Sequence, residues 1–314
     1  MRILHVTDSH LGVAGPPVGP HRRADDHLRA LREGLGPALR GEVDLVVHSG
    51  DLFDRSRPPG RAIAEAAALF AEVARVVPTL LMNGNHDWRG YRRVFPVPPA
   101  GLDVVDRPAR RVFGDVVLAL VPWAPDAARW AAHAREAVAG GADVLVAHQA
   151  FDGARVPGFT FRVGVQVDTV GPAHLPKGVR HVMCGHLHPR QRVGVGEACV
   201  VMPGSTERTA FSERDQTKGV ALWSFGRSVE ASFLDVAARP MVRITSRADL
   251  AAVVPGAMVR IDAADVDAAE VEARGAWCVD RPPRRAPPPP VPQLGLFGGN
   301  GRALEGQSPA VVGR

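Results

Sequence analysis

Side chains that bind divalent metals recur in five short clusters along the first two thirds of the chain. The clusters are Asp8 with His10, Asp51, Asn85 with His86, His148, and His186 with His188. Carboxylate, imidazole and amide groups without a thiolate suit borderline-hard ions such as Mn²⁺, Fe²⁺ or Zn²⁺. The set exceeds the needs of one ion, so we interpret it as two ions that share a bridging carboxylate. Such pairs lie about 3.5–4 Å apart and promote in-line attack on phosphorus.

Two of the clusters contain partners that are two residues apart, Asp8 with His10 and His186 with His188. In extended backbone this spacing places both side chains on one side of the chain, so that each pair can clamp one ion. Taken singly, each cluster has a plainer explanation, such as a structural histidine at His148 or a simple turn at GNHD. Their ordered occurrence, each after an apolar run, favours the metal interpretation.

An apolar run that is typical of a buried strand precedes each cluster. These runs cover residues 2–7, 44–48, 76–82, 144–147 and 181–184. Helical patterns cover 22–40, 61–75 and 126–139, and β-prone runs fill most of 190–234. Strands that alternate with helices predict an α/β fold, here a four-layer sandwich of two packed mixed β-sheets flanked by helices. Ligands of open α/β sheets bind beyond the carboxyl ends of the strands, where the polar clusters fall.

Composition divides the chain into three predicted parts. Residues 1–235 hold the metal-binding clusters, 236–281 hold two strand–helix pieces that suit a small cap-like domain, and 282–314 form a tail. The run RPPRRAPPPPVPQ, which begins at Arg281, is rich in proline and is expected to be extended and unpacked. We expect the tail to be disordered.

Charge and apolar content narrow the class of protein further. With 314 residues, of which 46% are hydrophobic, the chain can build a substantial core. The formal charge of +5 suits a polyanionic partner, although an arginine bias of the genome would give the same charge. No apolar run reaches the length of a membrane span, and MRILHVTDSH is too short and polar for a signal peptide. We therefore expect a cytoplasmic protein with no membrane partner.

The ordered set DxH, GD, GNHD, H and GHxH resembles the motifs of the calcineurin-like metallophosphoesterase superfamily over about the first 235 residues. The resemblance implies one metal held by Asp8, His10 and His188, a second held by Asn85, His148 and His186, and a bridge formed by Asp51. A metal-bound hydroxide would attack phosphorus. His86 would face the scissile phosphate, stabilising charge or protonating the leaving oxygen, and Asp87 could orient it.

Finer matches resemble the SbcD-type DNA-repair exonuclease family, the bacterial relatives of the Mre-type double-strand-break nucleases. The first matches are HSGDLFDRSRPP (48–59), DSHLG (8–12) and an R-x-x-D motif, which is either Arg22 to Asp25 or Arg23 to Asp26. The others are PGSTERTAF (203–211) with Lys218-Gly219, and Arg239-Pro240. This resemblance implies a two-metal-dependent DNA nuclease, with Mn²⁺ as the expected metal. It also implies an SbcC-type ATPase partner and a homodimer, although residues 240–280 are short for that family's cap and ATPase-binding helices. Candidate contacts to DNA phosphates are Arg22, Arg55, Arg57 and Arg89.

The tail carries one further motif, QLGLF at residues 293–297. It resembles the bacterial sliding-clamp-binding pentapeptide Q-L-x-L-F, in which apolar side chains of a short peptide fill a preformed groove. The residues that match are Gln293, Leu294, Leu296 and Phe297. Chance, or docking of this peptide onto the phosphoesterase domain, is the alternative.

Two other functions stay open on the sequence. One is a phosphodiesterase or phosphatase that acts on a small nucleotide or a lipid-linked substrate, because these motifs do not name the substrate. The other is a catalytically silent scaffold on a phosphoesterase fold. Loss of a metal ligand or of His86 would indicate a scaffold, and this chain retains all of them.

Overall fold

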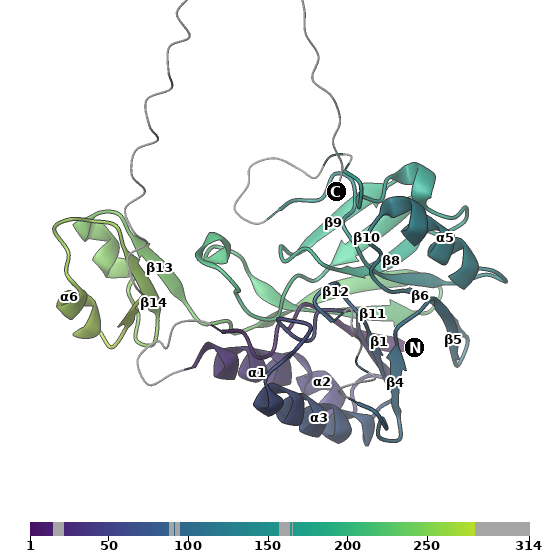
Figure 1. Ribbon diagram of the computed structural model, residues 1–314, viewed down its shortest axis with the longest axis horizontal. Coiled ribbons are helices and arrows are strands. Elements are labelled where there is room, and N and C mark those ends of the chain that lie inside the picture. Colours follow the sequence, from purple (N-terminus) through teal and green to yellow (C-terminus); the bar gives the residue numbers. More distant parts are fainter. Residues whose placement is uncertain (15–21, 88–90, 92–94, 157–163, 165, 280–314) are drawn as a thin grey trace, which may run out of the picture. The chain divides into compact units, whose positions relative to one another are not determined.

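The computed structural model describes residues 1–14, 22–87, 91, 95–156, 164 and 166–279 (Figure 1). The chain divides into two units, Met1–Asp280 and Arg281–Arg314, and only the first contains described residues. The candidate DNA contact Arg89 and the peptide at 293–297 therefore lie outside the described residues. Within the described part of the chain, no helix is both long and apolar enough to cross a membrane.

Six strands form the first sheet, in the order β12-β11-β1-β2-β3-β4. Their bounds are β1 Arg2–Val6, β2 Leu45–His48, β3 Thr79–Met82, β4 Leu102–Val105, β11 Lys218–Phe225 and β12 Val229–Val236. Strands β1 to β4 run parallel, β11 pairs with β1 antiparallel, and β12 pairs with β11 antiparallel. Every residue of β2 and β3 is buried, as expected for parallel strands that are covered on both faces.

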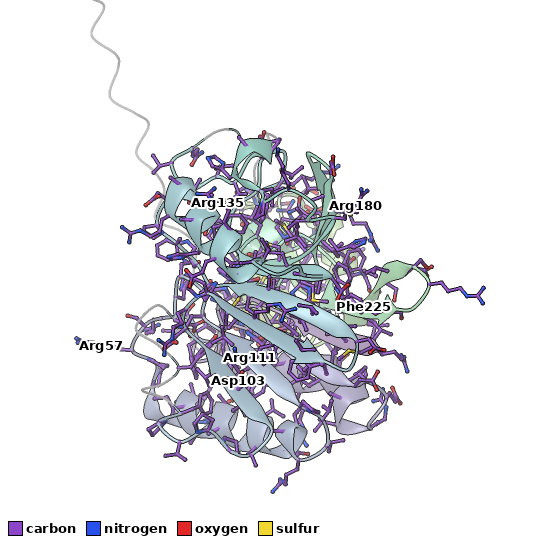
Figure 2. The ribbon with its side chains drawn as sticks, turned by 90° about the vertical axis from the view of Figure 1, so that its right-hand side faces the viewer. Arg57, Asp103, Arg111, Arg135, Arg180 and Phe225 are labelled. Atoms are coloured by element: carbon purple, nitrogen blue, oxygen red, sulfur yellow. The ribbon has the colours of Figure 1, made fainter. Side chains whose placement is uncertain are left out.

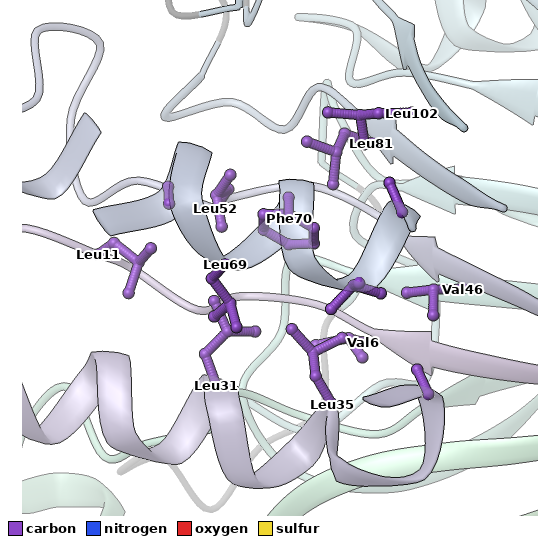
Figure 3. Packing of buried hydrophobic residues seen from close by; sticks show 14 of the residues in the cluster. Val6, Leu11, Leu31, Leu35, Val46, Leu52, Leu69, Phe70, Leu81 and Leu102 are labelled. Atoms are coloured by element: carbon purple, nitrogen blue, oxygen red, sulfur yellow. The ribbon is translucent and has the colours of Figure 1, made fainter. Parts of the chain in front are cut away.

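Three helices cover the outer face of this sheet (Figure 1). They are α1 Arg23–Gly34, α2 Gly36–Leu39 and α3 Gly60–Ala74. Leu31 and Phe70 of these helices pack with Val6 and Val46 of the sheet in one apolar core (Figure 3). The single helix predicted over 22–40 is divided in two, because Pro37 has no N–H to continue the hydrogen bonds of α1.

The second sheet also has six strands, in the order β5-β6-β7-β8-β10-β9. Their bounds are β5 Ala109–Phe113, β6 Val116–Val121, β7 Val144–His148, β8 His181–Gly185, β9 Gln191–Val195 and β10 Ala198–Met202. Helix α5 (Ala127–Ala137) covers its outer face, where Trp130 packs in a core with Leu145 and Phe151. The 3-10 turn Pro172–His174 lies between β7 and β8, and the 3-10 turn Phe211–Glu213 lies between β10 and β11 of the first sheet.

A third core lies between the two sheets and completes the sandwich. Ile3 and Leu80 of the first sheet pack there with Val146 and Met183 of the second. At one edge, Arg111 of β5 donates a hydrogen bond of 2.6 Å to Asp103 of β4, which ties the sheets together (Figure 2). The order helices, sheet, sheet, helix confirms the predicted four-layer fold.

A small parallel sheet follows β12, in the order β13-β14-β15. It consists of β13 Met241–Ile244, β14 Met258–Ile261 and β15 Trp277–Cys278, with the 3-10 turn Arg247–Ala252 and helix α6 Ala268–Glu272. It has an apolar core of its own, which includes Ile244, Val259 and Val271. The predicted division of the chain at residue 235 stays a prediction.

Residues 237–239 connect β12 to the small sheet. They are held by hydrogen bonds to side chains of α1 and of the loop after β10. The guanidinium of Arg239 donates two hydrogen bonds to Asp26, of 2.5 and 2.7 Å, and a third to the carbonyl of Gly256. Its backbone N–H donates to the carboxylate of Glu207. Asp26 also pairs with Arg23 at 2.7 Å, so the R-x-x-D motif is Arg23 to Asp26.

Candidate metal centre

The predicted ligands follow five strands whose carboxyl ends meet at one place. Asp8, Asp51 and Asn85 come shortly after β1, β2 and β3 of the first sheet. His148 is the last residue of β7, and His186 follows β8 directly. The structure therefore brings the seven predicted metal ligands together from both sheets, at the strand ends where open α/β sheets bind their ligands.

The first predicted ligand group, Asp8, His10 and His188, has its ligand atoms within 4.8 Å of one another. The Nε2 atoms of His10 and His188 lie 3.1 Å apart, and each is 4.0 Å from Oδ1 of Asp8. All three atoms face one point, as the ligands of one ion would.

The second predicted group surrounds the amide of Asn85. Its Oδ1 lies 3.1 Å from Nε2 of His148 and 3.0 Å from Nδ1 of His186. Asp51 stands between the two groups, with Oδ2 3.3 Å from Nε2 of His148 and 4.0 Å from Nε2 of His10. A carboxylate in this position is placed as a bridge between two ions would be.

The electrostatics of the centre favour a cation. Burial by itself would lower the pKa of His148, but the negative charges of Asp51 and Asp8 raise it to about 9. Burial would likewise raise the pKa of Asp51, but the positive charge of His148 and its hydrogen bond lower it below the ordinary value. A divalent ion satisfies the same carboxylates and leaves the imidazole neutral, which is the form that binds metals.

Two other histidines are held in the metal-binding form by burial. Burial and the neighbouring histidines lower the pKa of His186 to about 3. The same causes lower the pKa of His10 well below the ordinary value. Neutral imidazoles with free lone pairs, two carboxylates and one amide oxygen form a donor set that fits the two predicted divalent ions.

The backbone of the centre differs from the predicted extended form. Asp8, His10, Asp51 and His186 have positive φ angles of 51, 46, 54 and 88°, and they are the only non-glycine residues with positive φ in the described part of the chain. Extended geometry therefore does not explain how the DxH and HxH pairs converge. Each such residue costs about 1–3 kcal/mol and persists only where its surroundings impose the conformation.

Two glycines allow the loops of the centre to approach closely. A Cβ atom added to Gly84 would lie 2.2 Å from Oδ1 of Asp51. A Cβ atom added to Gly50, whose φ is 116°, would lie 2.3 Å from Nδ1 of His148. No side chain fits at either position, which explains the glycines of the GD and GNHD motifs.

His86 is oriented by Asp54 and not by Asp87 as predicted. Nδ1 of His86 donates to the carbonyl of Asp54 at 2.6 Å, and its backbone N–H donates to Asp51 at 2.9 Å. Its side chain is 40% exposed, so Nε2 is open to a ligand from solvent. Nε2 also lies 3.9 Å from Oδ2 of Asp51, close to the predicted ion positions.

Asp87 is buried, and its carboxylate holds loops together. It accepts hydrogen bonds from the N–H groups of Leu52, Phe53 and Gly84 and, at 2.6 Å, from the hydroxyl of Tyr91. None of these four donors belongs to His86. Burial and the charge of Asp51 raise the pKa of Asp87 to about 6. Because four donors already surround its carboxylate, Asp87 ties the Asp51 loop to the GNHD turn and does not hold the imidazole of His86.

The three candidate DNA contacts that are described, Arg22, Arg55 and Arg57, lie on the surface. Arg55 is 47% exposed and pairs with the carboxylate of Asp54 at 3.2 Å, beside His86. Arg57 lies at the surface (Figure 2). Arg22 is exposed and borders, with Gly12, a cavity of about 370 Å³. Contact of these arginines with DNA stays a prediction.

Sequence reasoning missed Glu213 and Lys218 as parts of the centre. Oε1 of Glu213 lies 2.7 Å from Nδ1 of the predicted ligand His188, and its Oε2 lies 2.7 Å from Nζ of Lys218. One signal was available, because Lys218 is one of only two lysines in this arginine-rich chain. A lysine retained against that bias indicates a specific role for an ammonium group.

Comparison with known proteins finds relatives among the DNA double-strand break repair proteins Mre11. The chain is 30% identical over 217 residues to the DNA double-strand break repair protein Mre11 of Aeropyrum pernix, covering 61% of this chain and 50% of that protein. It is 25% identical over 270 residues to the protein of the same name from Methanosarcina mazei, covering 79% of this chain and 40% of that protein. The chain thus spans half or less of the length of these two relatives.

Among solved structures, the crystal structure of TT1561 of Thermus thermophilus is similar, with a TM-score of 0.47 and 17% identity over 74% of this chain and 98% of that one. A family model also matches, that of the calcineurin-like phosphoesterases, over residues 1–190. This match covers more than half of the 314 residues and includes every predicted metal ligand. The chain belongs to the calcineurin-like phosphoesterase family, as its motifs predict.

Proposed function

We propose that the protein is a two-metal-dependent nuclease that hydrolyses phosphodiester bonds of DNA, in the manner of the DNA-repair exonucleases. One observation carries the proposal: the seven predicted metal ligands, which come from five strand ends, converge with Asp51 between the two groups. The similarity to the Mre11 repair proteins supports DNA as the substrate.

The residues of the centre have distinct roles in this proposal. Two divalent ions would activate water and neutralise the charge of the phosphate that is attacked. Asp51 would hold both ions, and the left-handed loops at Asp8 and His10 keep their donors in place. His86, fixed through Nδ1 by the carbonyl of Asp54, would present Nε2 to the phosphate or to the leaving oxygen.

A panel of metals and substrates tests the proposal. Purified protein is assayed with Mn²⁺, Fe²⁺, Zn²⁺ and Mg²⁺ against labelled linear DNA and against small phosphodiesters and phosphomonoesters. We expect metal-dependent release of nucleotides from DNA, with Mn²⁺ the most active. Hydrolysis of small esters alone would favour a phosphodiesterase or phosphatase, and no hydrolysis with any metal would favour a scaffold.

The bridging role of Asp51 has its own test. In Asp51→Asn, metal content measured by mass spectrometry and DNA hydrolysis should be lost together, since the amide has no charge to attract either ion. Asp103→Asn, at the far edge of the sheets, is the control and should keep both. A variant of Asp51 that keeps two ions and full activity would contradict the assignment.

The proposed partners besides DNA are an SbcC-type ATPase, a second copy of the chain and, through residues 293–297, the bacterial sliding clamp. The clamp proposal is tested by deleting these five residues. Clamp binding should disappear and DNA hydrolysis should not change, because the peptide lies apart from the metal motifs in the sequence. Equal clamp affinity with and without the peptide would end the proposal.

A further inference from the structure

We propose that Glu213, held in place by Lys218, is a positioning residue that strengthens metal binding by His188 and therefore acts on only one of the two metal sites. The inference rests on the proposed two-metal centre. It assigns a role to two residues whose side chains lie behind the predicted ligands.

The geometry around His188 carries the first step. Nδ1 of His188 donates its hydrogen to Oε1 of Glu213 at 2.7 Å, and the hydroxyl of Thr209 also donates to this oxygen at 2.7 Å. A hydrogen on Nδ1 leaves the lone pair of the ring on Nε2, which faces His10 and Asp8. Glu213 thus selects both the tautomer and the ring orientation that metal binding at Nε2 requires.

Lys218 carries the second step, because it keeps the carboxylate of Glu213 charged and fixed. Its side chain is fully buried, and Nζ donates to Oε2 of Glu213 at 2.7 Å, to Ser205 at 2.7 Å and to Gln216 at 2.9 Å. Nζ also donates, at 3.4 Å, to the backbone carbonyl of His188, so four acceptors surround the three hydrogens of the ammonium group. The buried ion pair between Lys218 and Glu213 therefore balances the negative charge of this carboxylate and fixes its position.

The contrast with His148 makes the effect specific to one site. Nδ1 of His148 donates to a backbone carbonyl, that of Ser49, at 2.8 Å. A carbonyl orients the ring in the same way but carries no charge. A carboxylate also makes the imidazole more basic, so that its Nε2 lone pair binds a metal ion more strongly. Removing such a partner typically weakens metal binding about 10–100-fold. Among the described residues, the imidazole of His188 has such a carboxylate behind it, and the imidazole of His148 does not.

A plainer explanation is that Glu213 and Lys218 form a structural ion pair. The two explanations differ in what a neutral replacement does. Glu213→Gln keeps the shape of the side chain and a carbonyl oxygen for His188, but it removes the charge and replaces Oε2 by an NH2 group that cannot accept from Lys218. A structural pair predicts lower stability with equal changes at both metal sites, whereas a positioning role predicts weaker binding at one site.

The experiment measures Mn²⁺ binding to the full chain by calorimetry and by electron paramagnetic resonance. Each metal site is measured separately, in a variant that lacks a predicted ligand of the other site. The site that contains His188 is measured in an Asn85→Ala variant, and the site that contains His148 is measured in a His10→Ala variant. In the first background, Glu213→Gln should weaken Mn²⁺ binding about 10–100-fold. In the second background, the change should stay below about twofold.

Glu207→Gln is the matched control, because Glu207 is a buried carboxylate of the same loop that accepts from the backbone of Arg208 and Arg239. It should leave Mn²⁺ binding in both backgrounds within about twofold. Unchanged binding in Glu213→Gln, or equal loss at both sites, would overturn the inference. Because Mn²⁺ binding is the measured quantity, the inference can hold even if wild-type protein fails to cut DNA.

Discussion

The buried His27 should make the stability of the protein fall steeply in mild acid. Its Nδ1 donates to the carbonyl of Ser9 at 2.9 Å, and its Nε2 is buried without a hydrogen-bond partner. A second proton would have to sit on Nε2, where nothing accepts it. Burial, helped by the positive charge of Arg23, accordingly lowers the pKa of His27 to about 4.

The size of the effect follows from proton linkage. The unfolded chain binds the proton near pH 6.5 and the folded chain only near pH 4, so the free energy of unfolding falls as the pH falls between these values. Above pH 6.5 the residue contributes no such loss. At about pH 5 the loss amounts to about 2 kcal/mol, and below the folded pKa it is constant at about 3.4 kcal/mol.

Urea unfolding of metal-free protein at about pH 7.5 and pH 5 tests this reasoning. The drop in unfolding free energy between the two conditions should be about 2 kcal/mol smaller in His27→Gln than in wild type. His133→Gln on α5 is the control, since this side chain is partly exposed and should leave the drop unchanged. An equal drop in His27→Gln and wild type would refute a neutral His27 in the folded state.

Three other substitutions have outcomes that follow from the structure. His86→Gln should keep both metals by mass spectrometry and lower DNA hydrolysis about 10²–10⁴-fold, and wild-type rates would contradict its role. Lys218→Met should lower the unfolding free energy by about 3–5 kcal/mol, because it leaves Glu213 buried without its cation. In the double variant with Glu213→Gln, the loss of unfolding free energy should be smaller than the sum of the losses in the two single variants. Asp26→Asn should expose the connection at Arg239 to trypsin and destabilise the chain by about 3 kcal/mol; an unchanged digestion pattern would argue against this ion pair as the tie to the small sheet.

Much of the fold could be predicted because apolar runs and clusters of polar side chains alternate along this chain. The run before His148, residues 144–147, contains no polar residue, so it must lie inside a covered sheet. This run and the other four predicted strands of the metal centre are each followed by one of the predicted metal ligands. Since the carboxyl ends of neighbouring parallel strands share an edge, the convergence of Asp8, Asp51 and Asn85 followed from their order alone.

The parts that sequence reasoning missed depend on backbone conformation and on distant contacts. The left-handed angles at Asp8 and Asp51 result from the surrounding loops, and no local pattern indicates them. The support of His86 by a carbonyl could not be predicted, because every residue has one. Glu213 lies 25 positions after His188, and only folding of the intervening strands β9 and β10 brings them together.

The left-handed ligand residues have a consequence for how this site would change over evolutionary time. Glycine adopts their backbone angles without strain, so replacement of His10 by glycine would relax the loop while it removed a ligand. Stability and metal binding therefore pull in opposite directions at these positions. A chain under selection for folding alone would drift toward glycine there, as a relic without activity. This chain has a carboxylate or an imidazole at all four positions, the composition expected if selection acts on metal binding there.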